Sequence, residues 1–493
     1  MISETLLNIK SIFFHNKTVK QTVFKNTFWL GVGLGVSKLL KMVLIIYVAR
    51  ILGATEYGKF TFALAFVSVF IIFSDLGLSA IITREFSRER EKDKEFYSIL
   101  SLKMILVLGT LILISIASFF ITPDPGIRKI ILILAFFSMV EGFATTIYVF
   151  FQAIQRMEYQ AFATILESIL VTGLGLFVIL HYPSVENISY TYLLTSLITL
   201  FFVLILFHFK VFPLRISFDK SVWKKFLLMA FPLVLSGVFN SIYNYTDSVM
   251  MGYWKLMAET GWYNAAYKLV AIAGIPLGLI FASFYPVLSR FFKESKEQLK
   301  RAWSYQMDIV ILSTIPLVVG GIVLAPKIID FAYGSNFTPA ILAFKILIVM
   351  TGITFFSQSF QYLLLAANQE KIFFWVTASA AVLNIVLNFL LIPRFSLYGA
   401  AVATTITYLL IFFLFLKLTT KFVGMHPFSF KSFTSFIGAA ISSILMYFVI
   451  SQPKIYNLNI FLSVIIGAAI YISSILTFKR LTKNPKLNFI KHD

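Results

Sequence analysis

Fourteen long apolar stretches fill this chain almost from end to end, and they restrict its fold more than any other feature. Each approaches or exceeds the ~20 residues that a helix needs to cross ~30 Å of hydrocarbon. They lie near residues 27–50, 58–82, 97–121, 128–151, 159–181, 188–209, 226–251, 262–289, 302–324, 339–366, 372–392, 397–416, 432–451 and 457–478. The pattern predicts an all-α integral membrane protein with about fourteen transmembrane helices.

Composition supports the same class. Hydrophobic residues make up 59% of the chain and charged residues only 13%, whereas a soluble chain is roughly half apolar. The chain has no cysteine, which excludes disulfides and thiolate metal or redox chemistry. No cleavable leader pattern precedes the first apolar stretch, so we expect this helix to remain as an uncleaved anchor.

The distribution of basic residues predicts the topology. With the N-terminus inside, 29 of the 42 Lys and Arg lie on the cytoplasmic side and 8 on the outer side, and five lie within helices. Cytoplasmic loops of membrane proteins are enriched in Lys and Arg. We therefore expect both termini to be cytoplasmic, and these loops explain the net charge of +20 without nucleic acid as a partner.

An internal repeat divides the chain near residue 215. Segment 54–63 opens the second predicted helix and resembles 258–268, which opens the eighth, so that Gly58 aligns with Gly261. Two later pairs follow at similar separations, Arg84 with Arg290 and 152–158 with 365–371. Six helices per half, both halves starting inside, predict two parallel bundles. The expected domains are 1–215, 216–422 and a C-terminal pair of helices in 423–493.

Four segments carry a family resemblance. They are RILGATEYGKFTFALAFVSVFIIFSDLGL (50–78), FPLVLSGVFNSIYNYTDSVMMGY (231–253), YGSNFTPAILAFKIL (333–347) and LNIVLNFLLIPRFSLYGAAVATTI (383–406). Together they resemble the polysaccharide transporter branch of the MOP exporter superfamily, which includes the Wzx-like O-antigen flippases. The resemblance covers roughly residues 20–480.

The resemblance implies a V-shaped pair of six-helix lobes that opens alternately to either face of the inner cell membrane. It implies a flippase that moves polyprenyl-pyrophosphate-linked oligosaccharide from the cytoplasmic to the outer leaflet. Expected partners are this lipid-linked oligosaccharide and membrane lipids. Candidate coupling ions are H+ and Na+, and glycan polymerases and glycosyltransferases are candidate protein partners. No cofactor is expected.

Lys38 and Lys41 are the first candidates for binding the pyrophosphate. They lie near the middle of the first predicted helix with i,i+3 spacing, and therefore share one face. A charge at the bilayer centre costs about 2.5–3.5 kcal/mol on insertion scales, so such side chains usually face a cavity or a partner. Two adjacent ammonium groups favour an anion between them. The alternative is ion pairing with Asp75 or Glu141.

Lys268 and Lys345 are two further candidates for the same anion. Each lies six or seven residues into its predicted helix, counted from the outer face. At that depth a lysine side chain can also extend to water at the membrane surface. The sequence leaves both interpretations open.

Carboxylates at membrane depth are candidates for ion coupling. Asp75, Glu141, Glu167, Asp247 and Asp308 all lie within predicted helices, and Glu141 is nearest the midplane. Buried carboxylates can bind and release protons near neutral pH, which would couple transport to a proton or sodium gradient. The alternative is a structural ion pair or hydrogen bond, and for Asp75 a cap or brace for Arg84.

Arg84 and Arg290 lie at equivalent repeat positions, at the inner ends of the second and eighth predicted helices. The positive-inside rule already explains them. A gating or lipid head-group role is the functional alternative.

Two other function classes fit the sequence less well. A cation-coupled multidrug exporter of the same superfamily would need an acidic, aromatic cavity, and Lys38 and Lys41 disfavour it. A polyprenyl-dependent glycosyltransferase or polymerase would need a large outer loop, and the outer loops here are short. The five His residues show no metal-ligand spacing. We therefore expect a transporter rather than an enzyme.

Overall fold

The computed structural model describes residues 16, 18–88, 93–211, 213, 215–424 and 430–483. Every regular element in these ranges is a helix, which confirms the all-α class. Both chain ends, and with them the expected cytoplasmic position of the termini, lie outside the described residues.

The helices follow one another with short connections. They are α2 (Val19–Asp75), α3 (Leu78–Arg88), α4 (Asp93–Ile121), α5 (Pro125–Ala153), α6 (Met157–His181), α7 (Val185–Lys210), α8 (Lys220–Tyr253), α9 (Met257–Ala273), α10 (Ile275–Glu294), α11 (Lys296–Tyr333), the 3-10 helix η1 (Ser335–Phe337), α12 (Ala340–Ala366), α13 (Glu370–Val423), α14 (Phe430–Ile450), α15 (Pro453–Tyr456) and α16 (Ile460–Lys483).

Eleven of the described helical segments are long and apolar enough to cross a membrane. Two of them, Gln21–Arg88 with 68 residues and Lys371–Val423 with 53, are more than twice the ~20 residues that one crossing needs. Each contains a non-helical residue, Gly53 with a φ of 76° and Ser396 with a φ of 52°. These breaks fall between stretches expected as separate spans. The total of fourteen crossings stays a prediction.

Local sequence signals set several helix starts. The Asp124 carboxylate accepts a hydrogen bond from the Gly126 amide (2.8 Å), and proline follows at the first helical position. Asp219 accepts from the Ser221 amide (2.8 Å) at the start of α8. Short polar caps of this kind satisfy amides that the helix itself leaves unpaired.

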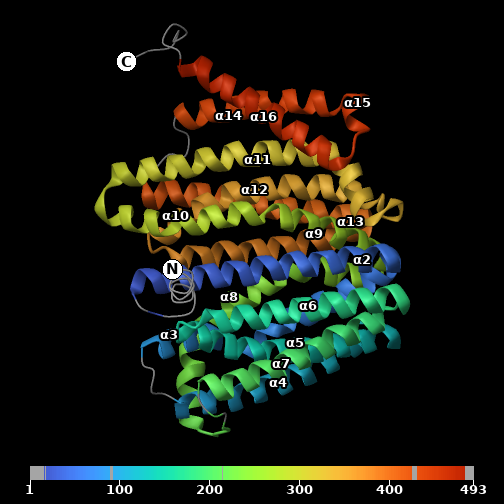
Figure 1. Cartoon of the computed structure of the whole chain (residues 1–493), viewed down its shortest axis with the longest axis vertical. Helices are drawn as coiled ribbons and strands as arrows, with labels where there is room; N and C mark the ends of the chain where they lie inside the picture. Colours follow the sequence, from blue (N-terminus) through green and yellow to red (C-terminus); the bar gives the residue numbers. More distant parts are fainter. Residues whose placement is uncertain are drawn as a thin grey trace, which may run out of the picture. The chain divides into compact units, whose positions relative to one another are not determined.

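The chain packs into two compact units, Met1–Gly261 and Trp262–Asp493. Within each unit the helices run nearly alongside one another (Figure 1). Helix α8 belongs to the first unit, because it packs against α2, α3 and α4. The packing boundary therefore differs from the repeat boundary expected near residue 215, which stays a prediction.

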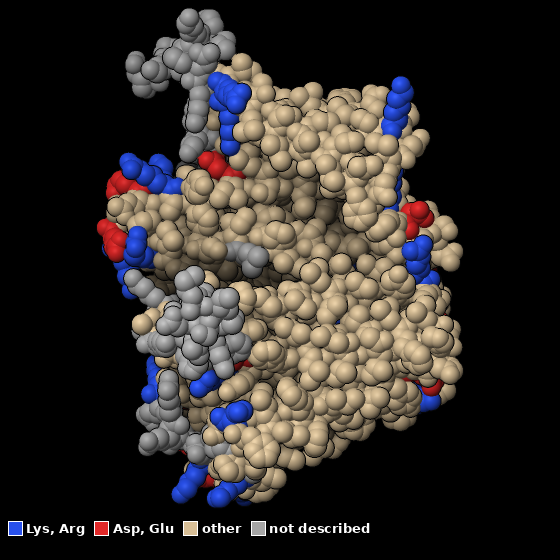
Figure 2. Space-filling view, viewed as in Figure 1, with Lys and Arg blue, Asp and Glu red and all other residues tan. Residues whose placement is uncertain are grey.

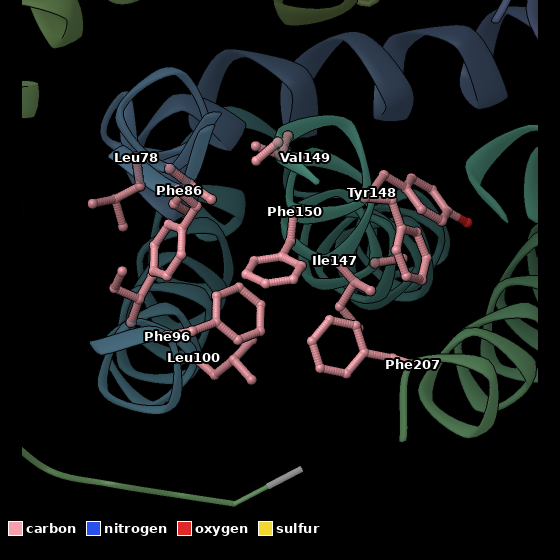
Figure 3. Packing of buried hydrophobic residues seen from close by; sticks show 14 of the residues in the cluster. Leu78, Phe86, Phe96, Leu100, Ile147, Tyr148, Val149, Phe150 and Phe207 are labelled. Atoms are coloured by element: carbon pink, nitrogen blue, oxygen red, sulfur yellow. The ribbon is translucent and has the colours of Figure 1, made fainter. Parts of the chain in front are cut away.

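An aromatic core explains why α8 packs with the first unit. The rings of Phe96 and Phe150 lie 4.3 Å apart, and Phe207 of α7 lies 5.3 Å from Phe96. Figure 3 shows these rings converging from α3, α4, α5 and α7. Phe226 of α8 joins the same cluster and is fully buried. Aromatic pairs of this geometry add to the energy of area burial.

Two turns show the same backbone geometry in the two halves. Gln155, between α5 and α6, has a φ of 61°, and Asn368, between α12 and α13, has a φ of 56°. The amide of Gln155 donates to the carbonyl of Gln152 (3.0 Å), and that of Asn368 donates to Leu365 (3.0 Å). These residues lie in the segments 152–158 and 365–371 that the repeat aligns. Lys255, between α8 and α9, has the same geometry, with a φ of 62° and its amide donating to the Gly252 carbonyl (2.9 Å), so the internal repeat stays a prediction.

Gly58 and Gly261, which the repeat also aligns, meet within the first unit. A Cβ atom on Gly58 would lie 1.7 Å from the carbonyl oxygen of Met257, and one on Gly261 would lie 2.0 Å from that of Ala54. Backbone atoms occupy the space that any side chain would need. Only glycine fits at this crossing of α2 with the first turn of α9.

Side chains on the outer faces of the helices suit a lipid environment. Phe120 and Phe209 are 82% and 78% exposed, and many other large apolar residues are also exposed. On the face shown in Figure 2, charged side chains gather near the helix ends and are scarce between them. Together with the apolar helices, this distribution identifies a multi-pass integral membrane protein.

Candidate functional site

A polar cluster lies inside the first unit, at the level of the middle of α2. The Lys41 ammonium lies 2.5 Å from the Glu167 carboxylate of α6. The Glu167 side chain is 5% exposed and that of Lys41 33% exposed. The Glu167 side chain is therefore shielded from solvent, whereas part of the Lys41 side chain is not.

Small residues set the register that brings these charges together. A Cβ on Gly33 of α2 would lie 3.0 Å from the backbone of Ala161, and one on Gly175 of α6 would lie 2.6 Å from Leu44. Between these two close approaches, the hydroxyls of Ser37 and Ser168 share a hydrogen bond. Close backbone approach at small residues is typical of membrane helix pairs.

Glu141 of α5 completes the cluster, because it interacts electrostatically with both Glu167 and Lys41. One ammonium therefore lies near two carboxylates, of which Glu167 is the one within ion-pair distance. If all three groups are ionised, one negative charge is left without compensation. A proton or a small cation could supply the missing positive charge.

Lys38, one turn away on α2, has a different environment. Its side chain is exposed, and among the residues that the structure describes it forms no ion pair. The expected pairing with Asp75 or Glu141 is thus not found for Lys38. Lys41 is paired, with Glu167 as its carboxylate partner and Glu141 as an additional electrostatic neighbour.

The two candidate lysines of the second unit also lack carboxylate partners within the described ranges. Lys268 is an exposed side chain of α9, and Lys345 is a half-buried side chain of α12. Both are cations within apolar helices. Cations in such positions usually face an aqueous or anionic partner.

Asp75 has a clear structural partner that the sequence analysis did not anticipate. Its carboxylate lies 3.1 Å from the ammonium of Lys103 on α4, which is only 2% exposed. It also accepts a hydrogen bond from the Ser79 hydroxyl (2.7 Å) in the first turn of α3. The expected cap or brace for Arg84 is not found among the described residues: Arg84 pairs with Glu85 (3.2 Å).

The remaining candidates are spread over the two units. Arg290 is 63% exposed and lies 3.5 Å from Glu294, a local surface pair. Asp247 on α8 and Asp308 on α11 are buried. In the described part of the chain, no three His, Cys, Asp or Glu side chains come together as a metal site.

A second buried ion pair escaped the sequence analysis. Lys25 of α2 lies 2.9 Å from Glu158 of α6, and both side chains are almost fully buried. Asn26 adds a hydrogen bond to the Gln155 side chain (2.6 Å). The sequence placed Lys25 in the tail before the first helix, whereas α2 already begins at Val19. This pair fixes the start of α2 to the turn between α5 and α6.

The fold is that of the MOP exporter superfamily. Over 92% of this chain and 98% of the other, the structure resembles the lipid II flippase MurJ in an inward closed conformation, with a TM-score of 0.74 and 18% sequence identity. An inward-facing multidrug resistance MATE transporter of the superfamily gives a TM-score of 0.65 at 15% identity, over 80% of this chain and 99% of the other.

A family model described as polysaccharide biosynthesis protein matches residues 23–292, and the chain belongs to that family. A similar relative, 24% identical over 91% of this chain and 94% of its own length, is the probable low-salt glycan biosynthesis flippase Agl15 of Haloferax volcanii. The capsular polysaccharide biosynthesis protein CapF of Staphylococcus aureus is 21% identical over 78% of this chain and 96% of its own.

Proposed function

We propose that this protein is a flippase that moves polyprenyl-pyrophosphate-linked oligosaccharide across the membrane by alternating access. The observation that carries the proposal is the set of cations at membrane depth without a carboxylate partner among the described residues: Lys38, Lys268 and Lys345. Lysines at membrane depth are explained more simply by an anionic ligand than by contact with lipid acyl chains. The names of the glycan flippase and capsular polysaccharide relatives agree with this cargo.

The pyrophosphate is the part of the cargo that needs the protein most. Moving an isolated charged group into hydrocarbon costs tens of kcal/mol on a Born estimate, whereas the apolar polyprenyl tail is soluble in the bilayer. Ammonium groups along the path lower this cost by direct ion pairing. In this mechanism Lys38 receives the head group, and the prenyl tail stays in the bilayer.

Lys41 links cargo binding to ion coupling. While it is paired with Glu167, its charge is not available to the pyrophosphate. Protonation of Glu167, or Na+ binding to its carboxylate, would weaken that pair and free the ammonium for the anion. Cargo and coupling ion would then shift the same equilibrium, between a state with Lys41 paired to Glu167 and a state with Lys41 free to bind the pyrophosphate.

The direction and setting follow from the same proposal. The protein lies in the cytoplasmic membrane with both termini inside, loads cargo at the cytoplasmic leaflet and releases it at the outer leaflet. Glycosyltransferases supply the cargo, and glycan polymerases or ligases consume it. The protein itself carries out no covalent chemistry.

Multidrug export is the second candidate, and the fold similarity to the MATE transporter favours it. An exporter of cationic drugs would need an acidic binding surface without free ammonium groups. The unpaired lysines therefore favour an anionic cargo over a cationic drug.

Disruption of the gene in its own host tests the proposal. We expect loss of a surface glycan and accumulation of its lipid-linked precursor on the cytoplasmic side, both reversed by the wild-type gene. Unchanged glycan together with increased sensitivity to cationic drugs would instead establish the exporter.

A further inference from the structure

A groove with a cationic end lies on the first unit, away from the Lys41 cluster. Its volume is about 560 Å³, and it lies between the end of α4, the first half of α5 and the first third of α7. Apolar side chains, among them Leu132, Phe136 and Leu193, line most of it. The charged residues in its lining are Arg128 and Lys129, both near the start of α5.

Arg128 is held in place but retains unused hydrogen-bonding capacity. Its guanidinium lies 4.8 Å from the centre of the Phe119 ring and donates to the Pro123 carbonyl (3.3 Å). Its Nε is buried and has no hydrogen-bond partner within the described residues. A buried donor without an acceptor is costly, so an oxygen ligand would stabilise this arrangement.

Neighbouring carboxylates do not use up the charge of Arg128. Asp124 accepts hydrogen bonds from the Gly126 and Ile127 amides (2.8 and 3.4 Å) as the α5 cap. Glu186 pairs with Lys129 at 2.6 Å, and both of these side chains are largely exposed. Arg128 is therefore the groove residue with the greatest capacity for an added anion.

We propose that this groove binds an anionic glycerophospholipid of the membrane, independently of the transported cargo. The lipid phosphate lies against Arg128, and one acyl chain follows α5 from Arg128 toward Phe136. That distance is about 12 Å at the ~1.5 Å rise per residue of a helix. Tyr190 in the lining matches the belt of Tyr and Trp that membrane proteins place at the head-group level. In the predicted topology this end of α5 faces the outer leaflet.

An adjacent groove provides a matched control. It lies between α6 and α7, has a volume of about 640 Å³, and shares Tyr190 and Leu193 with the first groove. No charged residue contributes to its lining. It offers the same apolar surface without the site for a phosphate.

Native mass spectrometry of the full-length protein in detergent, titrated with phosphatidylglycerol, tests the assignment. We expect saturable binding of phosphatidylglycerol with about tenfold weaker affinity in Arg128→Ala, and a smaller loss in Arg128→Lys, which keeps the charge but not the planar fork. Leu197→Ala in the control groove should leave the affinity unchanged. Zwitterionic phosphatidylcholine should bind more weakly than phosphatidylglycerol and should not depend on Arg128.

Equal affinity of wild type and Arg128→Ala for phosphatidylglycerol would overturn the proposal. Displacement of phosphatidylglycerol by equimolar polyprenyl pyrophosphate, lost in Arg128→Ala, would also overturn it, because the groove would then be a site for cargo. Glycerol phosphate without acyl chains should not bind measurably, and tight binding of it would reduce the groove to a simple anion site. These experiments measure lipid binding and not glycan transport, so their outcome is independent of the flippase proposal.

Discussion

Replacing the two lysines of α2 one at a time should have very unequal effects on the free energy of unfolding. In Lys41→Met the Glu167 carboxylate, 5% exposed, loses its partner while Glu141 keeps a second acid close by. In Lys38→Met an exposed cation without a carboxylate partner among the described residues becomes apolar. The two changes are chemically identical and lie one helical turn apart, so each controls for the other.

The burial of each lysine sets the expected difference in the free energy of unfolding between Lys41→Met and Lys38→Met. Breaking a buried ion pair by removing one partner typically costs 3–5 kcal/mol. Lys41 is one-third exposed, so water can reach the site and we expect about 1–3 kcal/mol for Lys41→Met. Lys38→Met should change the free energy of unfolding by less than about 0.5 kcal/mol. Glu167→Gln added to Lys41→Met should recover most of the loss, because it removes the unpaired charge.

Unfolding of the purified protein by SDS titration in mixed micelles measures these free energies. The reasoning requires the order wild type, Lys38→Met, double variant, Lys41→Met, from most to least stable, with the first two close together. Equal stabilities of Lys38→Met and Lys41→Met, or a double variant less stable than Lys41→Met alone, would refute it.

Two further substitutions test the packing of the first unit. Gly58→Val should strongly reduce the yield of folded protein, because backbone atoms already occupy the position of the new Cβ. Gly35→Ala should leave the yield unchanged, because the space around Gly35 is open. Equal yields of monodisperse protein from the two variants in size-exclusion chromatography would count against the close crossing. Lys25→Met should lower the melting temperature, because the buried Glu158 then keeps only the more exposed Arg156 (3.3 Å) as a cationic partner. Lys129→Met removes one partner of an exposed ion pair and should change the melting temperature little. Equal changes in melting temperature for Lys25→Met and Lys129→Met would contradict the burial of the Lys25–Glu158 pair.

The sequence was sufficient for the membrane class, the helical architecture and the family, because hydropathy reports directly on the solvent around each segment. It also aligned Gly58 with Gly261, two positions where backbone contact leaves no room for a side chain. The packing boundary was different. The repeat boundary near residue 215 stays a prediction, whereas the aromatic core extends past that residue and contains Phe226 of α8.

The ion-pair partners of the charged residues could not be predicted from the sequence. Lys41 and Glu167 are 126 positions apart, and the contact depends on how α2 and α6 fit together at Gly33 and Gly175. No local pattern encodes that register. Lys103 had one usable signal: a lone cation near the inner end of its helix, at a depth similar to Asp75.

The central claim is that unpaired ammonium groups in the membrane carry a pyrophosphate-linked glycan. The most direct measurement is translocation of a fluorescent polyprenyl-pyrophosphate oligosaccharide in proteoliposomes, comparing wild type, Lys38→Glu and Lys454→Glu, an exposed lysine of the short helix α15. We expect wild type and Lys454→Glu to move the lipid at equal rates and Lys38→Glu to lose at least nine-tenths of the rate while remaining folded. Full activity of Lys38→Glu would contradict the account.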